Sequence, residues 1–425
     1  MEPNHTNISP TSLEKRLGNE KFQPGDGWVD NLTKALQATT LTDTPVVPED
    51  SSYDMISLDT PDDALQLFLH KASEFEQLMA WMAKGSNCPT GDKHYAEKRA
   101  KVDKAGFTTQ RSIFLTMQNI AEELNQATGA FELSNRRPDV LDLCMAPGGY
   151  LAYALKKYLL MLANAVTLGR EKGGYAIHVP YDRRDSRVQV SFRDVTLLGY
   201  ELGMANVPEA IEAARVHPDN DELLCPWPFA APTNYHLVLC DGQVLRTHGR
   251  AEYRESCEST RLMCSQMAIA LQRVHIGGTI IALMHRAYQW NVFALLAGFA
   301  KFSDLQLFKP TCAHRESSSF YLVAKNLRPD SAEAKGMVEK LRRAWMACTF
   351  PELGMSTAVF DSSKDAVNQA VAEFGDTLLE MAKPIWEIQT EALRAATWMQ
   401  AEQVADEAQD KAQGQGDHDL LGEIE

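Results

Sequence analysis

The run VLDLCMAPGGYLAYAL, residues 140–155, constrains the fold more than any other part of this sequence. It begins as an apolar strand, breaks at Ala146-Pro147-Gly148-Gly149 and continues as an apolar helix. In an open α/β sheet, ligands bind at such a turn, outside the carboxyl end of a strand. Glycines let the backbone approach a ligand, and the following helix presents free N–H groups to an anion. The run therefore predicts an α/β fold with a ligand site at this turn.

Seven segments of the sequence are predicted to be strands: 140–144, 175–179, 187–192, 235–241, 278–284, 305–308 and 320–325. Helices are expected between several of them, at 150–164, 253–274 and 290–302. Strands that alternate with helices imply crossover connections and a mainly parallel sheet. The last two strands are separated by a loop too short for a helical crossover, so we expect that pair to be antiparallel.

The flanking regions differ from this α/β core. Residues 1–58 are rich in Pro, Thr, Ser, Asn and Asp and are predicted to be mostly disordered. A helical extension is expected over 59–107, the α/β domain over 108–326, a second helical region over 327–400 and an acidic disordered tail over 401–425. Within the domain, residues 197–234 form a long insertion with five prolines, which is either a lid or a surface excursion.

Charge is concentrated at the two ends of the chain. The formal net charge of the 425 residues is −15. Residues 1–60 carry 10 acids and 4 bases, and residues 402–425 carry 8 acids and 1 base, which leaves −2 for residues 61–401. A near-neutral core is compatible with an RNA partner but argues mildly against tight, nonspecific RNA binding.

Apolar runs and cysteines indicate the compartment. We find no cleavable signal and no apolar run of about 18 residues, so we expect a soluble intracellular protein, cytoplasmic or nuclear, without a membrane partner. The eight cysteines form no CxxC pair, and Cys144, Cys240 and Cys264 lie in expected core elements. That pattern is typical of reduced, buried thiols and predicts no metal site.

The sequence DLxxAPGG, from Asp142 to Gly149, resembles the cofactor-binding turn of the FtsJ-like methyltransferase family. The resemblance covers roughly residues 108–325. It implies a Rossmann-like seven-stranded sheet with a final antiparallel strand. It also implies S-adenosylmethionine as cofactor and RNA ribose 2′-hydroxyls as the methyl acceptors.

The resemblance assigns cofactor contacts to residues near three strand ends: Asp142, Ala146, Pro147, Gly148, Gly149, Tyr150, Asp194 and Asp241. Asp142 would bind the cofactor's amino group, Asp194 would recognise the adenine, and Asp241 would lie between the methyl donor and the ribose. Each also has an ordinary interpretation as a loop or helix cap or a turn residue, and the glycines can serve the turn alone. The family's ribose-binding acid should end the second strand, expected at 175–179, but the nearest carboxylate is Asp182.

The catalytic positions of the family are poorly preserved. FtsJ-like enzymes use a Lys–Asp–Lys–Glu set in which a lysine of lowered pKa deprotonates the ribose hydroxyl. Leu115 occupies the first Lys position in RSIFLT, Leu283 the second in GGTIIAL, and Ser319 the Glu position before Tyr321. Only Asp241 of the four remains. Because leucine cannot accept a proton, the resemblance implies weakened, altered or lost catalysis.

His285 is the candidate replacement for a missing lysine. It follows Leu283 by two positions, so on a strand both side chains face the same side, and its ordinary pKa suits proton transfer near neutrality. The competing interpretation is an ordinary residue just past a strand end. Additional charge could come from four other basic residues: Lys104, Arg111, His314 and Arg315.

Two further regions bear on partners. The helix expected at 94–104 carries His94, Tyr95, Lys98, Arg99, Lys101 and Lys104 where the resemblance expects RNA, although alternation with Glu97 and Asp103 is more often typical of a solvated face. Trp345, Trp386 and Trp398 lie in the C-terminal helical region, where packing is their expected role.

The leading functional interpretation is therefore an S-adenosylmethionine-dependent RNA ribose 2′-O-methyltransferase with a degenerate catalytic set. The alternative is a noncatalytic binding or scaffold protein that uses the C-terminal helices as its partner surface. A nucleotide-dependent oxidoreductase is disfavoured because G-x-G-x-x-G is absent from the turn.

Overall fold

The computed structural model describes residues 60–399, apart from residues 87, 182, 231–233 and 246. The segments 1–58 and 401–425, both predicted to be disordered, lie outside the described residues. Seven strands form one sheet in the order β3-β2-β1-β4-β5-β7-β6. They are β1 (Asp139–Leu143), β2 (Leu162–Thr167), β3 (Val188–Phe192), β4 (Tyr235–Cys240), β5 (Val274–His285), β6 (Asp304–Phe308) and β7 (Ser319–Lys325).

The sheet is mainly parallel. Neighbouring strands from β3 to β5 pair in parallel, whereas β7 is antiparallel to both β5 and β6. This confirms the predicted fold class, including the antiparallel final strand. β1 lies between β2 and β4, so the strand order reverses there, and an α/β sheet binds ligands at such a reversal.

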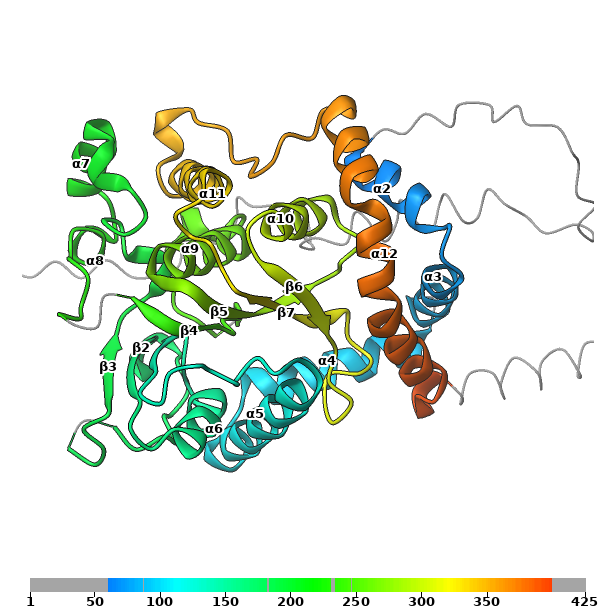
Figure 1. Ribbon diagram of the computed structural model, residues 1–425, viewed down its shortest axis with the longest axis horizontal. Helices are drawn as coiled ribbons and strands as arrows, with labels where there is room; N and C mark the ends of the chain where they lie inside the picture. The colour runs from blue at the N-terminus through cyan, green and yellow to red at the C-terminus, as the bar shows by residue number, and fades with distance from the viewer. Residues whose placement is uncertain (1–59, 87, 182, 231–233, 246, 400–425) are drawn as a thin grey trace, which may run out of the picture. The chain divides into compact units, whose positions relative to one another are not determined.

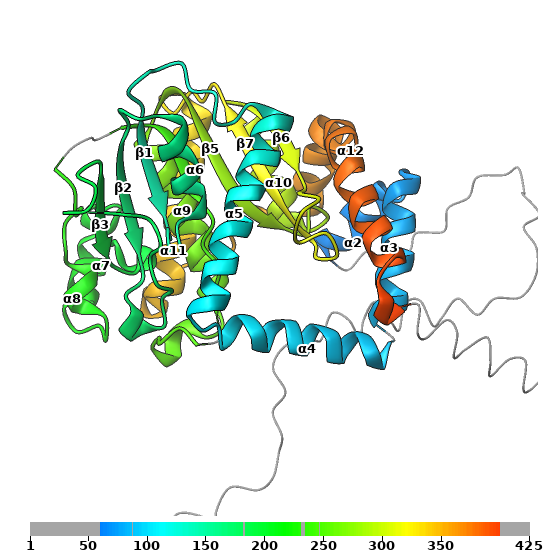
Figure 2. The same cartoon turned by 90° about the horizontal axis from the view of Figure 1, so that it is seen from below.

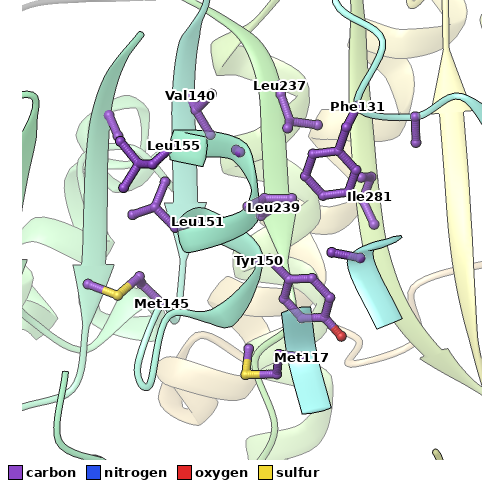
Figure 3. Close-up of a cluster of buried hydrophobic side chains, with 14 of the residues drawn as sticks. Met117, Phe131, Val140, Met145, Tyr150, Leu151, Leu155, Leu237, Leu239 and Ile281 are labelled. Carbon is purple, nitrogen blue, oxygen red and sulfur yellow. The ribbon is translucent and has the colours of Figure 1, made fainter. Parts of the chain in front are cut away.

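Helices cover both faces of the sheet (Figure 1). One face carries α5 (Phe107–Thr128) and α6 (Gly149–Lys157), and the other carries α9 (Glu258–Arg273) and α10 (Trp290–Ala300). α11 (Ala332–Thr349) packs on α9. Figure 3 shows the core between the sheet and α5 and α6, which includes Met117, Leu151, Leu155, Leu239 and Ile281.

A smaller helical group lies beside β6 (Figure 1). It consists of α2 (Pro61–Leu69), α3 (Ser73–Ser86) and α12 (Lys364–Arg394), and the rings of Phe75 and Trp386 meet in it with centroids 5.0 Å apart. α2 and α3 form the first part of the helical extension expected over 59–107. Trp345, Trp386 and Trp398 are all buried, which confirms their predicted role in packing.

The remaining helices are short or solvated. α4 (Pro89–Asp103) runs from the end of α3 to the start of α5 (Figure 2), and α7 (Pro208–Arg215) and α8 (Asn220–Leu223) lie on the β3 side of the sheet (Figure 1). Short 3₁₀ turns are η1 (Arg170–Lys172), η2 (Val195–Leu197), η3 (Met204–Asn206), η4 (Glu252–Arg254) and η5 (Pro351–Leu353). Among the described helices, none is long and apolar enough to cross a membrane.

The second strand lies elsewhere than predicted. The helix expected over 150–164 ends at Lys157, and residues 162–167 form β2. Tyr158 leaves the helical conformation, and its hydroxyl accepts a hydrogen bond from the Leu133 N–H at 2.7 Å and donates to the Phe131 carbonyl at 2.9 Å. These contacts hold the chain where it turns from α6 towards β2.

The predicted strand 175–179 is not a strand. The Ala176 N–H donates to the Gln110 side chain at 2.8 Å, and the His178 N–H donates to the Pro147 carbonyl at 3.1 Å. Two backbone donors of this segment are thus bonded outside the sheet, and the segment is an extended loop between η1 and β3.

Candidate functional site

A cavity of about 620 Å³ opens at the carboxyl ends of the central strands. Its volume lies in the range of about 300–1,000 Å³ typical of small-molecule sites. The residues that line it follow β1 (Cys144, Ala146, Pro147), β2 (Thr167, Leu168), β3 (Arg193–Thr196) and β4 (most of 241–250), with others from α4, α5 and the loop after β6. The cavity therefore lies where the sequence placed the ligand site.

The turn after β1 has an irregular backbone. Cys144 and Gly148 have φ of 70° and 95°, and the Ala146–Pro147 peptide bond is cis. Gly148 is the N-cap of α6 in the left-handed region, which favours glycine. Ala146, Pro147 and Tyr150 line the cavity, so this turn forms part of its wall.

The two glycines of the turn are also required by packing. A Cβ on Gly148 would lie 2.5 Å from Cγ2 of Val179, and a Cβ on Gly149 would lie 2.3 Å from Cβ of Met117. Neither glycine lines the cavity. Gly149 thus allows α5 to approach the start of α6, a reason for glycine that the sequence did not reveal.

Asp142 lies behind the cavity wall and does not line the cavity. It is a buried residue of β1, with only 3% of its surface exposed. Burial and the nearby charge of Asp241 raise its pKa well above the ordinary value. The raised pKa favours the protonated carboxyl, which lies in the core next to the turn.

Asp194 lines the cavity and is held by several contacts. One carboxylate oxygen accepts from the Thr196 N–H at 2.9 Å and its hydroxyl at 2.8 Å, and the other accepts from Arg254 at 2.5 Å. Burial raises the pKa of Asp194, but the charge and hydrogen bonds of Arg254 outweigh it, so that the pKa is lowered. Asp194 is therefore ionised, and it caps η2 as the ordinary interpretation expected.

Asp241 lines the cavity after β4, beside two tyrosines. The Tyr321 hydroxyl lies 3.4 Å from the Asp241 carboxylate and is hydrogen-bonded to the Tyr150 hydroxyl. Burial raises the pKa of Asp241 to about 7, and the hydrogen bond from Tyr321 lowers it only in part. Because all three side chains line the cavity, Asp241 can hold or release a proton there near neutral pH.

The three substituted catalytic positions contribute nothing to the cavity wall. Leu115 is 48% exposed on α5, Leu283 packs against the hydrophobic core from β5, and Ser319 is buried with its hydroxyl 2.7 Å from that of Ser317. None of them lines the cavity. The neighbouring Thr116 of α5 does line it, and it cannot serve as a strong base at neutral pH.

His285 does not line the cavity either, whereas His314 does. His285 is the exposed last residue of β5. Partial desolvation of its imidazole and the charges of Arg286 and Lys309 lower its pKa. Desolvation and the charges of Lys98, Lys309 and His285 lower the pKa of His314 to about 4, so this imidazole is neutral at pH 7. The sequence named His314 only as a source of charge.

Of the other basic residues named from the sequence, some line the cavity and others do not. Lys98 and Lys101 of α4 line the cavity, but Lys104, Arg111 and Arg315 do not. Lys98 and Lys101 were grouped with the whole basic helix, and their spacing alone did not show which side faces the site. Titratable groups other than Asp241 therefore do reach the cavity.

The acid expected at the end of the second strand is absent. β2 ends at Thr167, whose hydroxyl accepts a hydrogen bond from the Ala146 N–H at 3.2 Å. Thr167 and Leu168 line the cavity in its place. Asp182, the carboxylate named from the misplaced strand, lies outside the described residues.

The insertion 197–234 lies beside the cavity. None of its described residues lines the cavity wall. Its Glu222 carboxylate accepts from the Asp194 N–H at 3.3 Å, and its His217 lies 3.2 Å from the Thr349 carbonyl of α11. The described part of the insertion therefore supports the site from one side. The described residues contain no cluster of side chains suited to a metal ion.

Residues 120–327 match the sequence profile of the FtsJ-like methyltransferase family. A ribosomal RNA methyltransferase of Plasmodium falciparum is similar in structure, with 15% identity, a TM-score of 0.30, and coverage of 49% of this chain and 96% of that one. An rRNA methylase from Streptococcus thermophilus is 11% identical, with a TM-score of 0.30, and the match covers 47% of this chain and 92% of that one. Human methyltransferase-like protein 13, in complex with SAH, is 11% identical, with a TM-score of 0.27, and the match covers 55% of this chain and 88% of that one. No curated protein matches the sequence significantly.

Proposed function

Residues 120–327 of this chain belong to the FtsJ-like methyltransferase family, and from this premise we propose that the cavity binds S-adenosylmethionine. The observation that carries the proposal is the position of the cavity, over the Ala146-Pro147 turn and between the ends of β1 and β4. A cavity of about 620 Å³ is large enough for a cofactor of this size.

The wall of the cavity offers suitable groups for the parts of the cofactor. Asp194 is ionised and lies beside Val195 and Thr196, so that it can accept from the adenine amino group while apolar atoms contact the ring. Ala146, Pro147 and Tyr150 form the side that faces the methionine part. Gly148 and Gly149 shape this turn from behind, and Asp142 supports it from the core.

The proposal extends to catalysis, which is weakened, altered or lost. When bound, S-adenosylmethionine would supply an electrophilic methyl group, and a ribose hydroxyl would have to lose its proton as it accepts that methyl. Asp241, with a pKa of about 7, is the residue of the family set that can take this proton or orient the acceptor. Leu115, Leu283 and Ser319 remove the lysines and the glutamate that would assist it. RNA is the proposed acceptor.

Calorimetry with S-adenosylmethionine tests the cofactor proposal. We expect micromolar binding by the full chain. Asp194→Asn should weaken it about tenfold or more, because a hydrogen bond to a charged group contributes about 1.5–3 kcal/mol. Asp330→Asn, at an exposed residue away from the cavity, should bind as the native chain does. Absence of binding at high micromolar cofactor would refute the proposal.

Methyl transfer from labelled cofactor to cap, rRNA and tRNA substrates tests the catalytic part. Slow transfer or none is expected. Robust 2′-O-methylation that disappears in Asp241→Ala would show that the reduced set is sufficient and would contradict weakened catalysis.

The second candidate function is a noncatalytic protein that uses the same fold as a scaffold. It is favoured by the simultaneous loss of both lysines and the glutamate from the site. In that case a protein partner would bind the exposed faces of α11 and α12. Pull-down with a purified partner, retained in a variant unable to bind cofactor, would favour this function.

A further inference from the structure

The carboxylate of Glu222 joins two segments that border the cavity. Glu222 lies in α8, within the insertion 197–234, and is half-buried on the β3 side of the sheet (Figure 1). One of its oxygens accepts a hydrogen bond from the Lys172 ammonium, and the other accepts from the Asp194 N–H at 3.3 Å. Asp194 lines the cavity, but Glu222 and Lys172 do not. Glu222 is therefore placed to act on a ligand in the cavity through the residues that it holds.

The bond to Asp194 fixes the point where the chain leaves the sheet after β3. The Arg193 N–H still donates to the Thr167 carbonyl of β2 at 2.9 Å. Because successive residues of a strand direct their backbone groups to opposite edges, the next N–H, that of Asp194, points away from β2. Glu222 supplies the acceptor that this N–H would otherwise lack. The backbone of Asp194 is thus held by the insertion, in addition to the bonds that hold its carboxylate.

The bond to Lys172 links Glu222 to two further parts of the wall. Lys172 is the last residue of η1, and its carbonyl accepts a hydrogen bond from the Gly249 N–H at 3.1 Å. Residues 174–175, which follow η1, and residues 248–250, in the loop after β4, both line the cavity. Through Lys172, Glu222 is therefore connected to both of these lining segments.

Two neighbours of Glu222 bind the same side of the site. The Asp219 carboxylate accepts from the Tyr253 hydroxyl at 2.7 Å, and the Pro226 carbonyl accepts from the Arg193 side chain at 2.8 Å. These bonds lie on either side of Glu222 in the sequence, and they attach the insertion to η4 and to the end of β3. The insertion consequently brings Glu222 to a defined position next to the site.

We propose that Glu222 is a positioning residue for the adenosine part of the cofactor. It holds the end of β3, η1 and the loop after β4 in one arrangement, so that the wall segments keep the spacing that the ligand requires. The inference rests on the proposed function, because it takes Asp194 as the acceptor for the adenine amino group. Binding groups must be held to within about 0.5 Å of their productive positions, so a side chain outside the cavity can determine affinity.

Calorimetry of the full chain with S-adenosylmethionine and with adenosine tests the inference. Glu222→Gln keeps the size of the side chain but removes the charge that binds Lys172 and the Asp194 N–H. We expect both ligands to bind about tenfold more weakly, because both carry the adenine and because hydrogen bonds to a charged group are the stronger ones.

The matched control is Glu212→Gln, in the same insertion. The Glu212 carboxylate pairs with Arg215 at 2.8 Å, and both side chains are exposed. This variant makes the same substitution away from the cavity and should bind both ligands as the native chain does. Equal affinities of Glu222→Gln and Glu212→Gln would overturn the inference.

A double-mutant cycle shows whether Glu222 acts through Asp194. In a chain that already carries Asp194→Asn, the further change Glu222→Gln should weaken S-adenosylmethionine binding by less than about threefold, because residues in one network do not contribute additively. If the two losses multiply in full, Glu222 does not act through Asp194 and the positioning role is wrong.

Hydrogen exchange separates this inference from the proposed function, because it needs no cofactor. Glu222→Gln in the full chain should raise the exchange rates of the Asp194 and Gly249 amides several-fold, and Glu212→Gln should leave them unchanged. Unchanged rates in Glu222→Gln would refute the positioning role, even in a chain that binds the cofactor. Raised rates in a chain that binds neither S-adenosylmethionine nor adenosine would refute the cofactor proposal and leave Glu222 as the residue that holds these segments.

Discussion

Asp194 and Asp241 are two half-buried carboxyl groups that line the same cavity, and their surroundings move their pKa values in opposite directions. Asp194 gains Arg254 as a partner, and its pKa falls below the ordinary value. For Asp241 the described residues offer only the hydroxyl of Tyr321, and its pKa rises to about 7. The first is suited to binding a positively polarised group, and the second to exchanging a proton near neutrality.

The raised pKa of Asp241 predicts a pH-dependent stability gain for Asp241→Asn. Between pH 3.8 and about 7 the folded chain retains a proton that the unfolded chain has lost, so the stability of the native chain falls as pH rises through this window. The variant lacks this penalty. Its advantage should grow from pH 4 to pH 7 and then level off, with about 4 kcal/mol as an upper bound.

Melting temperatures from pH 4 to pH 8 measure this gain, with about 2–4 °C expected for each kcal/mol. Asp330→Asn is the control, because it makes the same substitution at an exposed residue that does not line the cavity. A difference in melting temperature between Asp241→Asn and the native chain that stays constant across this range would contradict a carboxyl that retains its proton in the folded state.

At the scale of elements, α11 is attached to the cavity through η2. Trp345 of α11 is fully buried, and its indole N–H donates to the Thr196 carbonyl at 2.8 Å. Arg261 of α9 donates to the same carbonyl at 3.2 Å and pairs with Glu258 at 3.0 Å. The turn that carries Asp194 is therefore held by a helix that lies outside the family domain.

Trp345→Phe should consequently affect the cavity as well as stability. It keeps an aromatic ring but removes one donor to Thr196, which should cost about 1 kcal/mol of unfolding free energy and weaken S-adenosylmethionine binding severalfold. Trp290→Phe is the matched control, since the buried Trp290 indole N–H has no hydrogen-bond partner among the described residues. Thermal melting and calorimetry should separate the two variants; equal effects would refute the link between α11 and η2.

Element patterns predicted the sheet better than they predicted the site. Six of the strands arise where apolar runs end at turns, and they were placed to within a few residues. β2 was missed because its sequence LANAVT continues the apolar pattern of α6, and only the contacts of Tyr158 show where the helix ends. His314 could not be found from spacing, because its position depends on the carbonyls that the buried Lys309 binds.

At the scale of the molecule, the segment that matches the family profile is shorter than the part of the chain that packs together around the sheet. The matched residues 120–327 begin inside α5 and end before α11. Phe114 and Met117, which belong to the core beneath the cavity, precede the match. Leu341 and Trp345, which are fully buried, follow it.

A fragment of residues 120–327 is therefore expected not to fold cooperatively, whereas residues 60–399 should. The short fragment would expose the surface of α9 that α11 covers and would lack the part of α5 that packs against Gly149. The loss of this buried apolar contact lowers the free energy of unfolding by more than the total stability of a marginally stable domain. Circular dichroism during heating should show one sharp transition for 60–399, within a few degrees of the full chain, and a gradual change for 120–327. A cooperative transition in the short fragment, together with S-adenosylmethionine binding, would instead show that α11 and the start of α5 are dispensable for the cavity.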